Sequence, residues 1–200
     1  MTDRSTEPRN IYHLAQPGGV DSGGFTIEAS ETSAWSRIIV EKTKADGTSL
    51  RLYSDSSPAP VAIARERKLS DRPGVAESTR AIAGVFEVVD EQGVALATLH
   101  KNALHSVLRT TWEIEFTDRS QATGRETNPL KVAVRRLLML AELLIDIPIR
   151  LSSGFVFHRD GEVLFTVETA SETSGAQTVS VFSPLDERIV LLQAALTRTR

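Results

Sequence analysis

Short apolar segments separated by turns are the feature of this sequence that most constrains its fold. The segment TTWEIEF (110–116) alternates, with Trp112, Ile114 and Phe116 on one face and Glu113 and Glu115 on the other. A period of two residues is typical of a β-strand with one buried face. Because about ten such segments succeed one another, we predict a β-sandwich or barrel rather than alternating strand–helix units.

The turn residues indicate how these segments are joined. Asp46-Gly47 and Asp160-Gly161 each stand between two apolar runs, which is a strong hairpin signal. AQPGGVDSGG (15–24) holds four glycines and a proline and is expected to be a loop. We therefore predict a flexible N-terminal segment (1–24), in which IYHLA (11–15) can form a short strand, followed by a single domain over 25–200.

Composition excludes several classes of protein. The 200-residue chain is 40% hydrophobic, enough for one core, and its net charge of −3 is not that of a general nucleic-acid binder. It has no cysteine, so thiol nucleophiles, disulfides and zinc–thiolate sites are excluded. The polar start MTDRSTEPRN contains no secretory signal, and we expect a cytoplasmic location.

NPLKVAVRRLLMLAELLIDIPIRL (128–151) is the most apolar stretch of the chain, and it predicts a helix over 129–147. Asn128 is a good N-cap, Pro129 suits the first helical position, and Pro148 ends the pattern. Its charged residues fall on one narrow stripe, apart from a single arginine: Lys131, Arg135, Glu142 and Asp146. A membrane span would place these charges in hydrocarbon, so we expect no transmembrane segment. Packing on the domain, contact with a protein partner or a second copy, and membrane contact are the alternatives.

A second helix is predicted at the C-terminus, in SPLDERIVLLQAALTRTR (183–200). Ser183 can cap it and Pro184 can begin it. Ile189–Leu192 and Ala194–Leu196 make it apolar on nearly every face. A helix that is apolar all round belongs in a core, and this one is too short to span a bilayer.

FEVVDEQGVALATLHKNALHSVLRTTWEIEFTD (86–118) resembles the core of the tubby C-terminal-like superfamily, closest to its LURP-one-related and phospholipid-scramblase branches. The shared pattern is a strand, an acidic turn with glycine, a return strand ending near Lys101, a connection with Ser106, and a strand carrying Trp112. The resemblance implies a closed antiparallel β-barrel of about 10–12 strands around a buried hydrophobic C-terminal helix. The 129–147 helix is then an addition to the family pattern. No functional residue is carried over, because the family's cysteine cluster, calcium-binding stretch and basic lipid contacts have no match here.

Linear motifs give no catalytic, cofactor or metal site. The spacing of His100 and His105 suits neither a helical metal pair nor one face of a strand. Asp90 and Asp160 stand alone in turns, without the further oxygen ligands of a calcium loop. The basic run ARERKLSDR can contact an anionic ligand through four residues, Arg65, Arg67, Lys68 and Arg72, or it is a solvated strand end.

These observations favour a non-catalytic binding or interaction module of unknown ligand, because a barrel filled by its own helix has little interior room for a substrate. The alternative, implied by the resemblance, is a phospholipid- or phosphoinositide-binding protein at a membrane surface. Anionic lipid, or a protein partner held by helix 129–147, are the expected partners. Nucleic acid is not.

Overall fold

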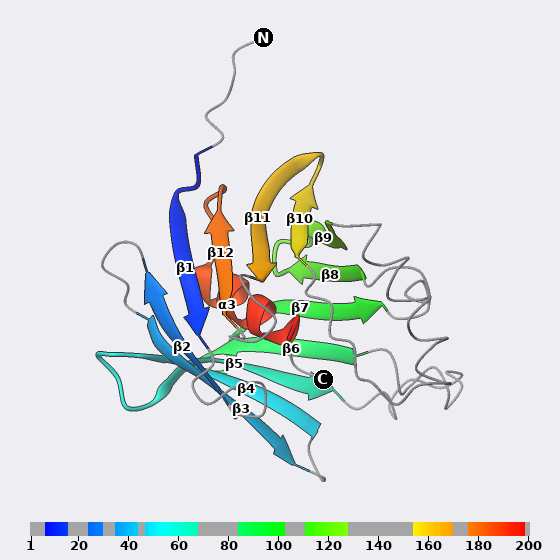
Figure 1. The fold of residues 1–200 in the computed structure, drawn as a ribbon. Helices are drawn as coiled ribbons and strands as arrows, with labels where there is room; N and C mark the ends of the chain where they lie inside the picture. The colour runs from blue at the N-terminus through cyan, green and yellow to red at the C-terminus, as the bar shows by residue number, and fades with distance from the viewer. Residues whose placement is uncertain are drawn as a thin grey trace, which may run out of the picture.

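The structure, a computed structural model, describes residues 7–15, 24–29, 35–43, 47–67, 84–102, 111–127, 154–169 and 176–198. These residues form twelve β-strands and one α-helix (Figure 1) with the following bounds: β1 (Asn10–Ala15), β2 (Gly24–Ala29), β3 (Trp35–Thr43), β4 (Gly47–Ser54), β5 (Pro60–Arg67), β6 (Gly84–Asp90), β7 (Ala95–Asn102), β8 (Thr111–Phe116), β9 (Gln121–Glu126), β10 (Phe155–Arg159), β11 (Glu162–Thr169), β12 (Gln177–Val181) and α3 (Glu187–Leu196).

Each strand pairs antiparallel with its neighbours in the chain, and β1 also pairs with β12, so the sheet closes into a barrel. The predicted closed antiparallel barrel around a C-terminal helix is confirmed. The predicted strand IYHLA lies in β1, whose Tyr12 and Leu14 are buried. This part of the N-terminal segment is therefore built into the barrel, where it separates β12 from β2.

The alternation read from TTWEIEF sets which side chains of β8 enter the barrel. Trp112 and Ile114 are buried, whereas Glu113 and Glu115 are exposed on the outer face. Phe116 is only half-buried, because it ends the strand at the rim of the barrel. Period two therefore predicts the two faces correctly along most of this strand.

Two predicted turns have the expected backbone. Asp160 and Gly161 both adopt positive φ, 53° and 84°, as the tight hairpin between β10 and β11 requires. Between β6 and β7, the Oδ1 atom of Asp90 accepts hydrogen bonds from the backbone N–H groups of Gln92 (2.9 Å) and Val94 (2.8 Å). Both aspartates shape turns.

Helix α3 begins later than the sequence suggested. Asp186, not Ser183, is its N-cap and accepts a hydrogen bond from the backbone N–H of Arg188 at 3.0 Å. The N–H of Ser183 instead donates to the carbonyl of Leu164 on β11, so Ser183 still follows the sheet. The expectation of a Ser183 cap was wrong, because sheet pairing extends past β12 and leaves the cap to Asp186.

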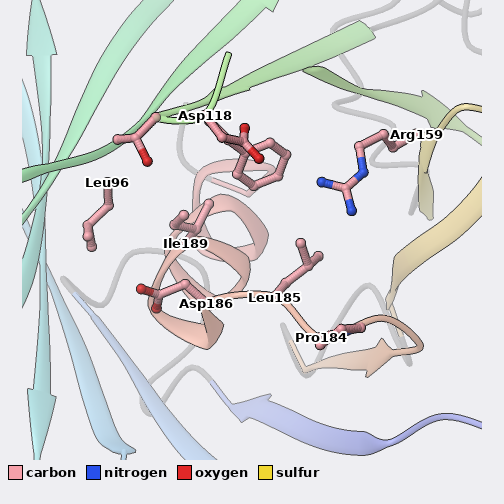
Figure 2. A pocket seen from close by; sticks show the side chains of 9 residues that line it. Leu96, Asp118, Arg159, Pro184, Leu185, Asp186 and Ile189 are labelled. Carbon is pink, nitrogen blue, oxygen red and sulfur yellow. The ribbon is translucent and has the colours of Figure 1, made fainter. Parts of the chain in front are cut away.

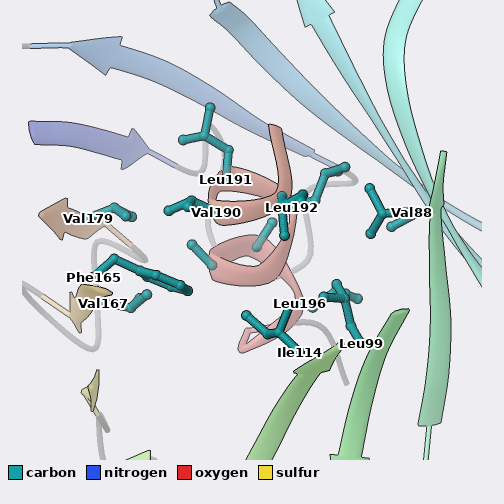
Figure 3. Close-up of a cluster of buried hydrophobic side chains, with 14 of the residues drawn as sticks. Val88, Leu99, Ile114, Phe165, Val167, Val179, Val190, Leu191, Leu192 and Leu196 are labelled. Carbon is teal, nitrogen blue, oxygen red and sulfur yellow. The ribbon is translucent and has the colours of Figure 1, made fainter. Parts of the chain in front are cut away.

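The barrel interior is filled by α3. Every residue from Ile189 to Leu196 is buried, and Figure 3 shows Leu192 and Leu196 extending from the helix towards Val88, Leu99 and Ile114 of the surrounding strands. Burial of each such side chain stabilises the fold by about 1.5–3 kcal/mol. The core is thus a layer of strand side chains around one apolar helix.

The two ends of the barrel differ. We call the end at which α3 starts the proximal end. Its described residues include 55–59, 90–94, 117–120 and 159–162, which close four hairpins, 182–188, which lead into α3, and 7–9, which lead into β1. The far ends of the strands, such as those of β5 and β7, lie at the opposite, distal end, because antiparallel neighbours alternate in direction.

Several predictions fall on residues that lie outside the described ranges. They include the helix predicted over 129–147, Lys68, Arg72 and His105. Within the ranges described, no helix is both long and apolar enough to cross a membrane.

Candidate functional site

A pocket of about 260 Å³ opens at the proximal end (Figure 2). It is formed where the starts of β7 and α3 meet the ends of β8 and β10. Its lining consists of Leu96, Phe116, Thr117, Asp118, Arg159, Pro184, Leu185, Asp186 and Ile189. The pocket is slightly smaller than the range of about 300–1,000 Å³ typical of drug-sized ligands, so it suits a small molecule or one side chain.

The floor of the pocket is apolar. Leu96, Phe116 and Leu185 are partly buried against the core, and Ile189 is buried in the first turn of α3. These side chains come from β7, β8, the β12–α3 connection and the helix. Because the helix fills the barrel below Ile189, the pocket ends there.

Arg159, the last residue of β10, supplies the cation of the pocket. Its guanidinium carbon lies 5.8 Å from the centroid of the Phe116 ring, within the range of a cation–π contact. Its Nη1 donates to the hydroxyl of Ser120 at 3.3 Å. Among the residues that the structure describes, Nε and Nη2 have no hydrogen-bond acceptor and can serve a ligand.

Asp118 supplies a carboxylate that is linked to Arg159 through the hydroxyl of Ser120. Its Oδ1 accepts hydrogen bonds from the backbone N–H (2.8 Å) and the hydroxyl (2.6 Å) of Ser120. These bonds, aided by the nearby charge of Arg159, hold the pKa of Asp118 below its ordinary value. Asp118 is therefore ionised near neutral pH.

The carboxylate of Asp186 is already engaged in contacts within the protein. Besides capping α3, it makes a two-pronged ion pair with Arg188, whose Nη2 lies 2.7 Å from Oδ2 and whose Nε lies 3.0 Å from Oδ1. The hydrogen bonds to Asp186 raise the pKa of Arg188, with smaller contributions from the charges of Asp90 and Glu91. Asp186 therefore shapes the pocket wall and has little capacity left for a ligand.

The polar groups of the pocket are engaged with one another. A general acid needs a pKa near the working pH, and the pKa of Asp118 is moved away from it. The hydroxyl of Ser120 is hydrogen-bonded to Asp118 and Arg159 and has no imidazole or amine beside it among the described side chains. In the same ranges, His, Cys, Asp and Glu do not gather in groups of three that would hold a metal ion.

The predicted basic residues lie elsewhere. Arg65 and Arg67 are on the outer face of β5 towards the distal end. Arg67 donates from Nε (3.2 Å) and Nη2 (2.7 Å) to the two carboxylate oxygens of Glu87. Arg65 is exposed and stands directly across from Glu87 in the β5–β6 pair. The structure does not bring them to the pocket, and Glu87 offsets much of their charge.

The described histidines are dispersed over three strands. His100 on β7 lies 3.9 Å from Glu115 on the outer face. His13 on β1 is 3.2 Å from the hydroxyl of Thr178, and His158 stands opposite Thr123. These positions are those of outer-face side chains.

The sequence does not reveal the pocket, because four separate elements form it. Arg159 and Ser120, which are 39 positions apart, meet only through the pairing of β8, β9 and β10. The available signal was the polar turn Thr117-Asp118-Arg119-Ser120 after an alternating strand. That turn predicts a loop, not a binding site.

No family model, curated protein or solved structure matches the chain.

Proposed function

We propose that the protein is a non-catalytic binding module and that the proximal pocket is its ligand site. The observation that carries the proposal is the composition of the pocket. Its apolar floor lies next to Arg159, whose Nε and Nη2 have no acceptor among the described residues and can donate hydrogen bonds to a ligand. An apolar cavity with a few convergent polar groups is the usual form of a small-ligand site. A ligand with an apolar body and one hydrogen-bond acceptor fits it best.

Kinship with the tubby C-terminal-like superfamily is part of the same proposal. Its support is the pattern over 86–118 together with the twelve-strand barrel closed around an apolar C-terminal helix. Since one fold hosts many functions, the fold alone does not specify the ligand.

Chemical-shift mapping of the full chain tests the ligand site. We expect a set of small apolar fragments bearing a carboxylate or an amide to perturb the backbone amides of Leu96, Asp118 and Ile189. Leu96→Trp, which narrows the pocket, should abolish these changes, and Arg159→Gln should weaken them. Arg125→Gln, on the exposed outer face of β9, is the matched control. If no fragment perturbs the pocket residues, it is not a ligand site.

A second candidate function is binding of anionic phospholipid by a cytoplasmic protein at a membrane surface. It is favoured by Arg65, which is exposed and makes no ion pair or hydrogen bond with the side chains that the structure describes. Each basic group near an anionic surface contributes about 1 kcal/mol. Flotation with phosphatidylserine vesicles at low and high salt tests it, with Arg65→Glu as the variant. Absence of the protein from the vesicle fraction at both salt concentrations excludes this function.

The segment predicted as helix 129–147 is proposed to pack on the chain's own barrel or to hold a partner. Its single polar stripe leaves a wide apolar face that needs to be covered. Light scattering coupled to size exclusion separates the cases: a dimer supports self-association, and a strict monomer excludes it.

A further inference from the structure

The proximal end is strongly acidic. Five of its described segments, residues 55–59, 90–94, 117–120, 159–162 and 182–188, contain eight carboxylates and three arginines, and the lead-in to β1 adds one of each, Glu7 and Arg9. The whole chain has a net charge of only −3. Negative charge is therefore concentrated at the end where the pocket opens.

Of the three arginines in these segments, Arg119 is exposed and faces solvent, whereas the other two are engaged with neighbouring side chains. Arg188 is bound to Asp186 and also feels the charges of Asp90 and Glu91. Arg159 lies against Phe116 and Ser120 inside the pocket. The exposed carboxylates in these segments outnumber the exposed Arg119, and they are Asp55, Glu91, Asp118, Asp160 and Glu162. A partner approaching the pocket meets carboxylates first.

Apolar surface accompanies the charge. Val94, 56% exposed, and Val163, 36% exposed, are the large hydrophobic side chains that stand out to solvent in the described part of the chain. They come from the β6–β7 and β10–β11 hairpins, the same two hairpins that supply Leu96 and Arg159 to the pocket. An apolar pocket between these hairpins and beneath an acidic rim fits a partner that is both basic and apolar.

We propose that the occupant of the pocket is a basic peptide segment, in which one aliphatic side chain enters the pocket and lysine or arginine side chains meet the rim. The inference rests on the proposed binding function and names its partner. A backbone carbonyl of the peptide is the acceptor for the guanidinium of Arg159, which is hydrogen-bonded to Ser120 on its other side. An anionic membrane and a second acidic end of the same protein are both repelled by this rim.

Fluorescence anisotropy with three labelled hexapeptides tests the partner. One alternates lysine and leucine, one glutamate and leucine, and one lysine and serine. We expect the lysine–leucine peptide to bind, the glutamate–leucine peptide not to bind, and the lysine–serine peptide to bind about tenfold more weakly, because it has no side chain for the pocket. Binding should weaken at higher salt.

Variants locate the complex. Glu91→Lys with Asp160→Lys should weaken binding of the lysine–leucine peptide about tenfold, and Leu96→Trp should abolish it. Glu113→Lys, on the outer face of β8, should leave it unchanged. The inference is overturned if the glutamate–leucine or the lysine–serine peptide binds as tightly as the lysine–leucine peptide. It is also overturned if Leu96→Trp leaves binding of the lysine–leucine peptide unchanged, or if that peptide does not bind at all. If apolar fragments still bind the pocket when the basic peptides do not, only the identity of the partner is lost and the binding function stands.

Discussion

The indole Nε1 of Trp35 donates a 2.8 Å hydrogen bond to Glu187, which ties the first residue of β3 to the first residue of α3. Asn10 donates from Nδ2 to the other carboxylate oxygen at 2.5 Å, and the phenol of Tyr12 also hydrogen-bonds Glu187. One side chain of the helix therefore holds β1, which closes the barrel by pairing with β12, and β3, which lies two strands away from β1.

Replacement of Glu187 by alanine should reduce the free energy of unfolding by about 1–3 kcal/mol, because partly buried donors lose their acceptor. Urea unfolding followed by tryptophan fluorescence measures the change. Glu113→Ala, which removes an exposed carboxylate on β8, should stay within about 0.5 kcal/mol of the wild type. Equal stability of both variants would show that the Glu187 bonds contribute nothing.

Tyr12 should make stability depend on pH in the alkaline range. Burial, and then the bond to Glu187, raise the pKa of Tyr12 above its ordinary value of 10.0. A group with a raised pKa in the folded state stabilises the fold fully below its unfolded pKa, and this stabilisation is lost as the pH rises past about 10. Tyr12→Phe should therefore lower stability at pH 7 but flatten its fall above pH 10.

Urea midpoints between pH 8 and 11.5 test the Tyr12 prediction. Tyr53→Phe is the control, since Tyr53 packs against the guanidinium of Arg37 on the outer face and not against Glu187. A wild-type slope in Tyr12→Phe contradicts the prediction.

The position of Gly124 has no room for a side chain, because the ring of Phe157 lies against it. A Cβ atom added there would lie 2.3 Å from Cε1 of Phe157. The Phe157 ring cannot retreat, because it is stacked on Phe165 with centroids 4.1 Å apart. Gly124→Ala should cost about 1–3 kcal/mol in unfolding free energy by overpacking, and adding Phe157→Leu should recover part of that cost if the clash is its cause. Thermal unfolding of the single and double variants measures both effects, and a double variant less stable than the sum of the singles contradicts this cause.

The cap of α3 gives a graded prediction. Asp186→Ala should lower the unfolding free energy by about 0.5–2 kcal/mol, whereas Asp186→Ser keeps a capping oxygen and should lose less. Urea unfolding followed by circular dichroism ranks the two. Ser183→Ala, at the position first expected to be the cap, should have little effect. A large loss in Ser183→Ala would reverse the assignment.

The sequence predicts features that depend on neighbouring residues better than features that depend on residues far apart in the chain. Trp112 and Ile114 alternate with glutamates, so their burial depends only on local period and was predicted. The N-cap of α3 was not predicted, because both Ser183 and Asp186 are suitable capping residues. The hydrogen bond from the N–H of Ser183 to the carbonyl of Leu164 decides between them. The pocket depends on strand register, which brings Arg159 to Ser120 and is not encoded in any single segment.

Because its first and last strands pair with each other, the barrel can close only after all of its strands have been synthesised. β1, the first strand of the barrel, pairs with β12, the last strand, so that Tyr12 lies opposite Val179, and the helix that fills the core follows all twelve strands. Until β12 and α3 have been synthesised, β1 and β11 are open edges around an unfilled interior, and open edges invite pairing with other chains. Contacts of such long sequence separation slow folding. We expect folding to be slow, with the nascent chain most prone to aggregation before α3 has been made.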